Sequence, residues 1–393
     1  MATPHRRVSA YYRLAIVMVV ASSILHHQGA AEQSPPAGET EAALLLEMKR
    51  AWGDPPALAA WSAAASAAGA HCRWPYVGCD YAGRVTNLTL AGTNITGRIP
   101  DAVGGLSSLV NFNLSYNSIT GAFPTVLYRC RSLRYLDLSI NYLSGKLPDD
   151  IGHDLGANLS TLYLSGNEFN GSIPASLYKL QNLQYLDVSA NQMNGAFPTA
   201  LYHCRHSLQY LDLSFNHIGG KLPDEIGHGL STNLISLELW HNKFNGSIPT
   251  SLSRLQNLRY LGLAFNRFTG NNPFDTGELP TSFENLTNLL SLWVAGCGLV
   301  GDFPSYVVKM AKLEYVDLSY NSLTGSIPTG VWSLRNLQLL FLHGNKLTGN
   351  LTVDGFAATG LTQIDLSENK LTGVIPKVFG CLENLTIELD LKQ

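Results

Sequence analysis

Charged residues are scarce in this chain of 393 residues, because Asp, Glu, Lys and Arg together make up 14% of it, well below the roughly one quarter typical of globular proteins. The formal net charge is −3, and no block of basic residues occurs. This balance argues against nucleic acid or an anionic membrane as a partner. After the first 31 residues no apolar run reaches the roughly eighteen residues of a membrane helix, so we expect no membrane span in this chain.

The first 31 residues have the pattern of a secretory signal peptide. Several arginines precede a mainly apolar run over residues 14–25, and the small residues Gly29, Ala30 and Ala31 suit cleavage. We therefore expect residues 1–31 to direct the chain into the secretory pathway. The expected location is extracellular, or the cell surface if the chain is a fragment of a membrane receptor.

An asparagine recurs at intervals of 24 to 26 residues along most of the chain, with one gap of 55. It belongs to the pattern Leu-x-x-Leu-x-Leu-x-x-Asn-x-Leu-x-Gly-x-Ile-Pro, and Thr93 and Cys297 hold its place in two further repeats. The ten ladder asparagines are Asn117, Asn141, Asn167, Asn191, Asn216, Asn242, Asn266, Asn321, Asn345 and Asn369. A period of this length predicts a solenoid of about twelve coils.

The residues of one repeat suggest how each coil is built. Leu136 and Leu138 point inward from a short strand, whereas Asp137 points to the other face. Asn141 follows the strand, where its amide can satisfy backbone groups of the turn, and Gly145 permits a bend with positive φ. A single coil cannot bury its leucines, so the coils stack and their strands form a parallel sheet on a concave wall.

The predicted fold is therefore an α/β solenoid, shaped as a horseshoe or superhelix with a parallel concave sheet and an N-terminal disulfide cap. The cap is expected at residues 32–84, the repeats at 85–384, and an incomplete repeat without a C-terminal cap at 385–393.

Six cysteines are expected to give one disulfide and four thiols. Cys72 and Cys79 lie close together before the first repeat, where an exposed end needs a cap, so we expect a bridge between them. Cys297 takes the place of a ladder asparagine. The other three, Cys130, Cys204 and Cys381, are expected to be buried thiols on the convex side.

Nine Asn-x-Ser/Thr sequons suit a secreted protein. They are Asn87, Asn94, Asn113, Asn158, Asn170, Asn245, Asn285, Asn350 and Asn384. Asn87 and Asn113 are expected to project from the concave face, where a glycan would close that end to a ligand.

The N-terminal region resembles the cap of plant leucine-rich-repeat receptor kinases. The residues that carry this resemblance are Leu44-Leu45-x-x-Met48-Lys49-x-x-Trp52-Gly53-Asp54-Pro55, Leu58-x-x-Trp61 and Cys72-x-Trp74-x-x-x-x-Cys79. The long irregular repeat that includes Leu292-Trp293-Val294-Ala295-Gly296-Cys297 is similar to the HAESA-like subfamily. This resemblance implies an extracellular, plant-type horseshoe in the apoplast that binds a secreted peptide on its inner face and recruits a leucine-rich-repeat co-receptor kinase.

The chain departs from that family at its end and on its strands. It stops at Gln393, inside a thirteenth coil, and it contains no kinase catalytic-loop or magnesium-binding signature. The late Arg-x-Arg pair with which such receptors hold a peptide's carboxylate is also missing. We therefore expect a truncated ectodomain with no enzymatic activity and no cofactor.

Three apparent chemical motifs have better structural interpretations. Residues 296–301 satisfy Gly-x-Gly-x-x-Gly but lead into no helix. Residues 203–206 contain possible metal ligands, yet the matching segment 129–131 lacks both histidines, so a surface loop is expected. The strand carboxylates recur once per coil and are expected to form a solvated column. We therefore expect no catalytic, cofactor-binding or metal-binding residue.

A tandem duplication supplies an internal comparison. Residues 121–191 and 195–266 align with one inserted residue, and 46 of 71 positions are identical. About a third of all positions differ, but on the concave face of the last two coils of each copy six of six do. Tyr163, Ser165 and Gly166 correspond to the second copy's Glu-x-Trp-His segment at 238–241, and Asp187, Ser189 and Ala190 correspond to Gly262, Ala264 and Phe265. Drift of solvent-facing residues and a new recognition surface both explain this divergence.

Aromatic residues favour the recognition surface, because exposed rings on a sheet are costly unless they contact something. They interrupt the Asp and Ser residues that otherwise repeat in coils seven to eleven. The predicted ligand-binding residues are Glu238, Trp240, His241, Phe265, Trp293, Phe341 and His343.

The predicted function is a receptor-like recognition protein that binds a secreted peptide or protein in plant cell-surface signalling. One alternative is a fragment of a complete transmembrane receptor Ser/Thr kinase. Another is a wall-associated binder of polysaccharide or of a pathogen hydrolase, in which the same aromatic residues would contact the ligand.

Overall fold

The computed structural model describes residues 40–62, 69–268, 277–353, 355–382 and 384–388. The chain divides into two units, and the description below concerns the second, Thr40–Gln393. The predicted signal peptide and the last five residues of the predicted incomplete repeat lie outside the described residues.

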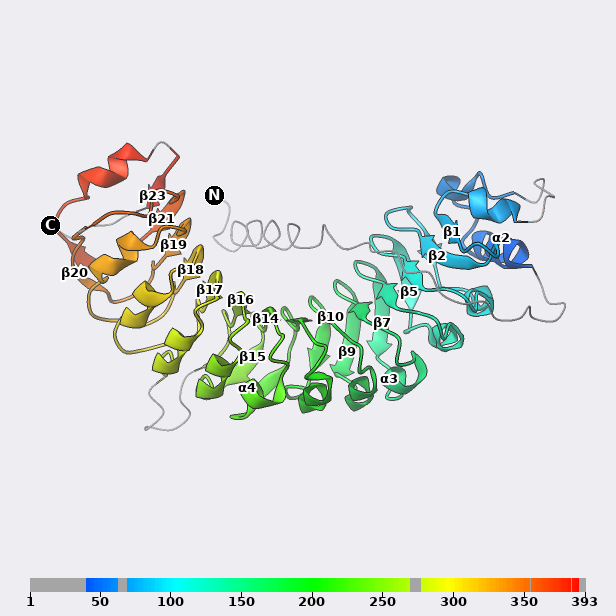
Figure 1. The fold of residues 1–393 in the computed structure, drawn as a ribbon, viewed down its shortest axis with the longest axis horizontal. Coiled ribbons are helices and arrows are strands. Elements are labelled where there is room, and N and C mark those ends of the chain that lie inside the picture. The colour runs from blue at the N-terminus through cyan, green and yellow to red at the C-terminus, as the bar shows by residue number, and fades with distance from the viewer. Residues whose placement is uncertain (1–39, 63–68, 269–276, 354, 383, 389–393) are drawn as a thin grey trace. The chain divides into compact units, whose positions relative to one another are not determined.

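One fourteen-stranded sheet runs through the second unit, with its strands in chain order (Figure 1). The first pair is antiparallel, and the later pairs are parallel, as predicted. The strands are β1 (Val77–Cys79), β2 (Val85–Thr89), β4 (Asn111–Asn113), β6 (Tyr135–Asp137), β8 (Thr161–Tyr163), β10 (Tyr185–Asp187), β12 (Tyr210–Asp212), β14 (Ser236–Glu238), β16 (Tyr260–Gly262), β17 (Ser291–Trp293), β18 (Tyr315–Asp317), β19 (Leu339–Phe341), β21 (Gln363–Asp365) and β23 (Thr386–Glu388).

A second set of strands pairs neighbouring coils after the ladder position. They are β3 (Thr96–Gly97), β5 (Ser118–Gly121), β7 (Tyr142–Lys146), β9 (Glu168–Ser172), β11 (Gln192–Asn194), β13 (Gly219–Lys221), β15 (Lys243–Asn245), β20 (Thr348–Asn350) and β22 (Lys370–Thr372).

Short helical turns form the wall opposite the sheet. Most begin directly after the proline of the repeat, whose fixed φ suits a helix start. Besides the cap helix α2 (Glu41–Ala51), the α-helical turns are α3 (Ile151–Asp154) and α4 (Ile226–Gly229). The 3₁₀ turns are Pro56–Leu58, Ala70–Arg73, Asp101–Gly105, Thr125–Arg129, Ala175–Lys179, Thr199–Cys204, Thr250–Arg254, Thr281–Asn285, Ser305–Lys309, Thr329–Ser333 and Lys377–Cys381. Across the described part of the chain, every helix is too short or too polar to cross a bilayer.

The ladder asparagines tie each coil to the one before it. The Asn141 amide donates to the Leu114 carbonyl of the preceding coil at 2.9 Å and to two carbonyls of its own coil. Its Oδ1 accepts from the Ile119 amide at 2.9 Å. The asparagine is 6% exposed, so these bonds satisfy backbone groups that water does not reach. The predicted role of this residue is confirmed.

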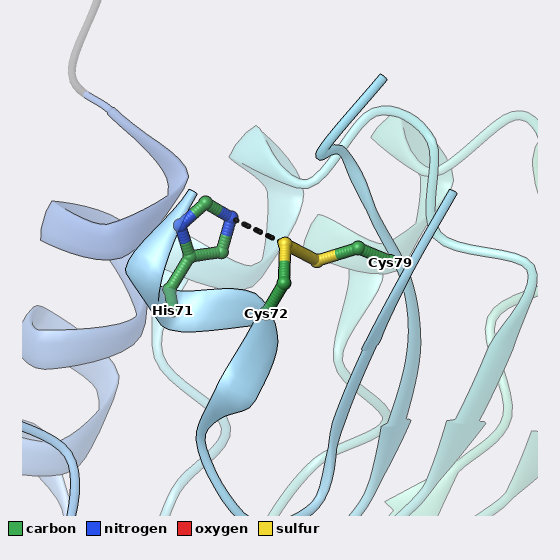
Figure 2. A group of neighbouring side chains, drawn as sticks. All are labelled: His71, Cys72 and Cys79. Carbon is green, nitrogen blue, oxygen red and sulfur yellow. Dashed lines mark hydrogen bonds between the residues drawn. A yellow bond between two sulfur atoms is a disulfide. The ribbon is translucent and has the colours of Figure 1, made fainter. Parts of the chain in front are cut away.

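A small cap closes the first coil. Helix α2 buries Leu45 and Met48, and its Glu41 accepts a hydrogen bond from the backbone amide of Val85 at the start of β2. Cys72 and Cys79 form the expected disulfide, with His71 beside it (Figure 2).

The cysteine prediction is wrong for one residue. Cys130, Cys204 and Cys297 are buried thiols, but Cys381 is exposed. The physical reason is a shift of one position: Cys130 lies three residues before its repeat leucine, whereas Leu382 occupies that inward position in the last coil. Burial raises the pKa of the Cys130 thiol to about 11 and that of Cys297 to about 12, so both stay protonated near neutral pH.

The disulfide should matter mainly for the cap. Because it closes a loop of only seven residues, replacing both cysteines by serine should lower the free energy of unfolding by roughly 2–3 kcal/mol. Thermal unfolding of the secreted double variant measures this loss. Wild-type melting together with wild-type secretion would contradict it.

Replacing a buried ladder asparagine should lower the free energy of unfolding more than replacing an exposed asparagine. We expect Asn216→Ala to destabilise the solenoid by about 3–5 kcal/mol, because several buried backbone groups lose their partners. The matched control is Asn257→Ala, which removes one exposed hydrogen bond to Thr232 and should cost less than about 1 kcal/mol. Equal denaturation midpoints for the two variants would refute the ladder's role.

Candidate functional site: the concave face and its aromatic cluster

Register places the predicted site residues in rows across the sheet. The position between the two strand leucines forms one row, in which Glu238, Trp293 and Phe341 lie on β14, β17 and β19. Most other members of this row in coils three to twelve are carboxylates: Asp137, Asp187, Asp212, Asp317 and Asp365.

These aspartates close their strands and are not the solvated column that the sequence predicted. Asp137 accepts hydrogen bonds from the amide and hydroxyl of Ser139 at 2.9 and 2.6 Å, and Asp317 does the same with the serine two residues on. Asp137 and Asp212 are 7% and 1% exposed, because neighbouring tyrosine hydroxyls also cover them. The Asp-x-Ser pair is therefore part of the coil's structure.

Coil seven lacks this pair, because Glu238 and Trp240 occupy the two positions that hold Asp and Ser in the coils named above. The Oε1 atom of Glu238 accepts from the Ser236 hydroxyl at 3.2 Å, whereas its buried Oε2 atom has no hydrogen-bond partner in the described structure. A Cβ atom on Gly262 would lie 2.0 Å from Oε2 and 2.9 Å from the Trp240 ring. The glycine of the next coil therefore makes room for both side chains.

Three carboxylates adjoin one another across β10, β12 and β14, since Asp187, Asp212 and Glu238 are in register. Burial, followed by repulsion from Asp187, raises the pKa of Asp212 to about 7. Burial, followed by repulsion from Asp212, raises the pKa of Glu238 well above its ordinary value. This part of the concave face therefore changes charge near neutral pH.

Trp240 is not the exposed anchor that the sequence predicted, since it is only 2% exposed. Its ring packs edge-on against Phe215 with centroids 4.3 Å apart and lies 6.5 Å from the ring of Trp293. Gly262 of the next coil leaves room for the indole, since a Cβ atom there would approach it to 2.9 Å, and the rings of Phe215, His241 and Trp293 lie around it. Trp240 therefore supports the face and does not project from it.

His241 and Phe265 continue this group as a stack of rings. Phe215 and His241 are nearly parallel, with centroids 4.6 Å apart and planes at 8°, and His241 and Phe265 are 4.5 Å apart at 21°. We call Phe215, Trp240, His241, Phe265 and Trp293 the aromatic cluster. Sequence analysis missed Phe215, although its place directly before a ladder asparagine, like that of His241 and Phe265, was a usable signal.

Phe341 and His343 belong to a separate group. The His343 ring meets Tyr320 edge-on at 4.6 Å, and its Nδ1 atom lies 3.2 Å from the Asp365 carboxylate. Phe341 lies 6.3 Å from the same imidazole. The structure therefore divides the seven predicted residues between the aromatic cluster with Glu238 and this second group.

The predicted sequons lie at positions of differing exposure. Asn87, Asn94, Asn158, Asn285, Asn350 and Asn384 are exposed, and Asn113, Asn170 and Asn245 are half-buried. The Oδ1 atom of Asn113 accepts hydrogen bonds from the amide and the hydroxyl of Ser115, as the strand aspartates do from their serines. Asn87 pairs with Gly78 of the cap. Glycosylation of these residues stays a prediction.

One cluster of metal-ligand types occurs among the described residues, and it lies in the cap. Ligand atoms of His71, Cys72 and Cys79 all lie within 4.8 Å of one another. Both sulfur atoms are joined in the disulfide, as Figure 2 shows, so neither is available as a thiolate ligand.

The carboxylate row should make stability depend on pH. Burial raises the pKa of Asp212 in the folded protein to about 7. The stability that the protonated carboxyl group contributes is therefore complete below the unfolded pKa of about 3.9 and is lost as pH rises through about 7. The free energy of unfolding should therefore fall between pH 4.5 and 8. Asp212→Asn should remove part of this fall, on the order of a few kcal/mol. An unchanged pH profile of the melting temperature in this variant would contradict the assignment.

Comparison with known families agrees with the architecture. Residues 83–143, 157–218 and 287–347 match the leucine rich repeat family, and a second profile of the same description matches 233–255 and 360–382. Residues 39–80 match the leucine rich repeat N-terminal domain. Polygalacturonase inhibitor 1 of Oryza sativa subsp. japonica is 41% identical over 68 residues, which cover 17% of this chain and 20% of that protein.

Solved structures give longer matches. The ectodomain of the Arabidopsis thaliana membrane receptor kinase GASSHO1/SCHENGEN3, solved with CASPARIAN STRIP INTEGRITY FACTOR 2, matches at a TM-score of 0.75 and 30% identity, over 89% of this chain and 44% of that one. The PEPR1–AtPEP1 structure matches at 0.71 and 29% identity, over 89% and 51%. The chain thus spans about half the length of these receptor ectodomains or less. It is a leucine-rich-repeat solenoid with the fold of plant receptor ectodomains.

Proposed function

We propose that this protein is a non-catalytic, extracellular recognition protein that binds a secreted peptide or protein in plant cell-surface signalling. The observation that carries the proposal is the change in the concave face at coil seven. There Glu238 and Trp240 occupy the positions at which most coils hold an Asp-x-Ser pair and the first copy holds Tyr163 and Ser165, and half-buried Trp293 and Phe341 follow in the row of Glu238. The coil gives up local hydrogen bonds in favour of a ring-lined surface.

The receptor likeness supports a peptide as the ligand. The two receptor structures above contain CASPARIAN STRIP INTEGRITY FACTOR 2 and AtPEP1, and each match covers 89% of this chain. A co-receptor kinase as second partner, membership of the HAESA-like subfamily, and origin from a longer receptor kinase belong to the same proposal. The resemblance of residues 41–393 to such receptors supports them.

The rice relative favours a second candidate function, the binding of a pathogen hydrolase at the plant cell wall. That relative is named as a polygalacturonase inhibitor and is 41% identical over 68 residues. The same concave face would then contact a folded enzyme. Inhibition of a fungal polygalacturonase by the purified protein would favour this candidate over the peptide receptor.

Binding of secreted peptides tests the main proposal. We would screen the purified, secreted protein against a synthetic library of plant secreted peptides by thermal shift, and measure the affinity of each hit by calorimetry. Trp293→Ala should weaken a hit about tenfold or more, because truncation of interface aromatics commonly costs about 2 kcal/mol. Tyr163→Ala, in the same row of the first duplicated copy, is the matched control and should change affinity less than twofold.

Trp240 should not serve as the test residue, because its burial means that truncation would also destabilise the coil. Equal affinity of Trp293→Ala, Phe341→Ala and the Tyr163→Ala control, with all three folded, would overturn the proposed concave site.

A further inference from the structure

A ridge of side chains runs beside the ladder asparagines. The residue directly before the ladder position has positive φ in each of the twelve coils, and Gly92, Gly166, Gly296 and Gly344 occupy it in four. In an L-residue this conformation costs roughly 1–2 kcal/mol, which glycine avoids. Large side chains nevertheless occupy it in six coils: Tyr116, Ile140, Phe215, His241, Phe265 and Tyr320.

The backbone at this ridge is held firmly. The amides of Phe215 and His241 donate to carbonyls of the following coil at 3.0 and 2.9 Å, as part of the ladder between coils. The side chains therefore leave a fixed backbone in one direction, which reduces the entropy cost of binding a ligand.

Three basic side chains lie on the other side of the ladder asparagines, next to the ring stack. His217, Lys243 and Arg267 each follow a ladder asparagine directly and are exposed. None of the three forms an ion pair with a carboxylate of the described residues. Together with Phe215, His241 and Phe265 they line a hollow of about 380 Å³. We call these six residues the rim patch.

The first copy of the duplicated block lacks both the ring stack and the basic side chains of this patch. Its equivalent ridge residues are Ile140, Gly166 and Ala190, and the positions after its ladder asparagines hold Tyr142, Glu168 and Gln192. The backbone conformation is the same, with φ of 52°, 63° and 50° along that ridge. All six positions differ. Five of them lie inside the aligned block, where 46 of 71 positions are identical, and the Gln192/Arg267 pair follows it directly. The second copy therefore combines rings and positive charge where its scaffold does not require them.

We propose that the rim patch binds an acidic, extended segment of the peptide ligand. The charge of Lys243 and Arg267, with His217 beside them, complements carboxylates. The stacked rings present their edges, and the edge of an aromatic ring carries the positive part of its quadrupole. Burial also raises the pKa of Asp212 to about 7 and that of Glu238 well above its ordinary value, which weakens the opposition of these two carboxyl groups to the attraction.

The ring geometry favours a peptide over an acidic polysaccharide. Sugar rings bind aromatic side chains by lying on their faces, but the faces of His241 are covered on both sides by Phe215 and Phe265. The site also lies beside the concave face, so one extended chain can contact both. The inference thus rests on the proposed peptide ligand and adds the chemistry of one of its segments.

Model peptides test the rim patch separately from the natural ligand. The probes are octaglutamate, octalysine and an oligogalacturonate of eight units, each with a fluorescent label, and anisotropy gives the affinity at several salt concentrations. Octaglutamate should bind the wild-type protein more weakly as salt rises. The charge variant His217→Tyr, Lys243→Glu and Arg267→Gln, which copies the first repeat block, should weaken this binding at least tenfold. Octalysine should not bind at the patch.

A reciprocal variant tests sufficiency. Ile140→Phe, Gly166→His and Ala190→Phe, combined with Tyr142→His, Glu168→Lys and Gln192→Arg, should raise the stoichiometry of octaglutamate from one to two. The far-ultraviolet spectrum and melting temperature show that each variant is folded. Absence of octaglutamate binding to wild type, or equal binding to the charge variant, would overturn the proposal.

Other outcomes separate the alternatives. Binding of oligogalacturonate but not octaglutamate, with the same loss in the charge variant, would assign the patch to polysaccharide and refute the peptide segment. If the charge variant loses octaglutamate binding but Trp293→Ala leaves the affinity for library peptides unchanged, the proposed concave function is refuted and the rim patch stands. If Trp293→Ala weakens the library peptides but the charge variant binds octaglutamate as wild type does, the rim patch alone is refuted.

Discussion

The buried asparagine amide between successive coils is the interaction on which the rest of this structure depends. Each such amide satisfies backbone groups of two coils at once, so it fixes both the spacing of the strands and the path by which the chain leaves them. The positive φ of the preceding residue is part of that path in all twelve coils. Side chains on either side of the ladder are thereby held in straight columns, and a change of residue in one column changes the surface without moving the backbone.

That separation of scaffold from surface explains how the duplicated block diverged. In ordinary coils an Asp-x-Ser pair closes the strand, and the pair is itself buried. Coil four of the first copy holds Tyr163 and Ser165 at these positions, whereas coil seven holds Glu238 and Trp240, and room for the latter two comes from Gly262 in coil eight. Changes in two adjacent coils thus depend on one another, as expected if a surface was built and not merely allowed to drift.

Much of the fold followed from the sequence, because its period is long and its residues have simple physical roles. The parallel sheet, the ladder bonds and the Cys72–Cys79 bridge were predicted correctly. The solvent exposure of individual side chains on the concave face was predicted less well. Alternation along a strand predicts on which face Trp240 lies, but the exposure of its ring depends on the small size of Gly262 in the next coil and on the neighbouring rings of Phe215 and Trp293. Likewise, Asp137 points away from the leucines yet is buried by Ser139 and Tyr135. Such contacts cross between coils, and a reading of one repeat at a time does not reveal them.

The central claim is that the binding surface is formed by the side chains that distinguish the second copy of the duplicated block from the first, together with Trp293 and Phe341 in the coils that follow. Replacing residues 195–267 by residues 121–192 tests it most directly, since this exchange removes all six rim-patch residues while the two blocks share their ladder asparagines and turns. The account predicts a folded protein, with a melting temperature within a few degrees of wild type, that no longer binds the peptide ligand found by the library screen. Wild-type affinity in this folded chimera would contradict the account.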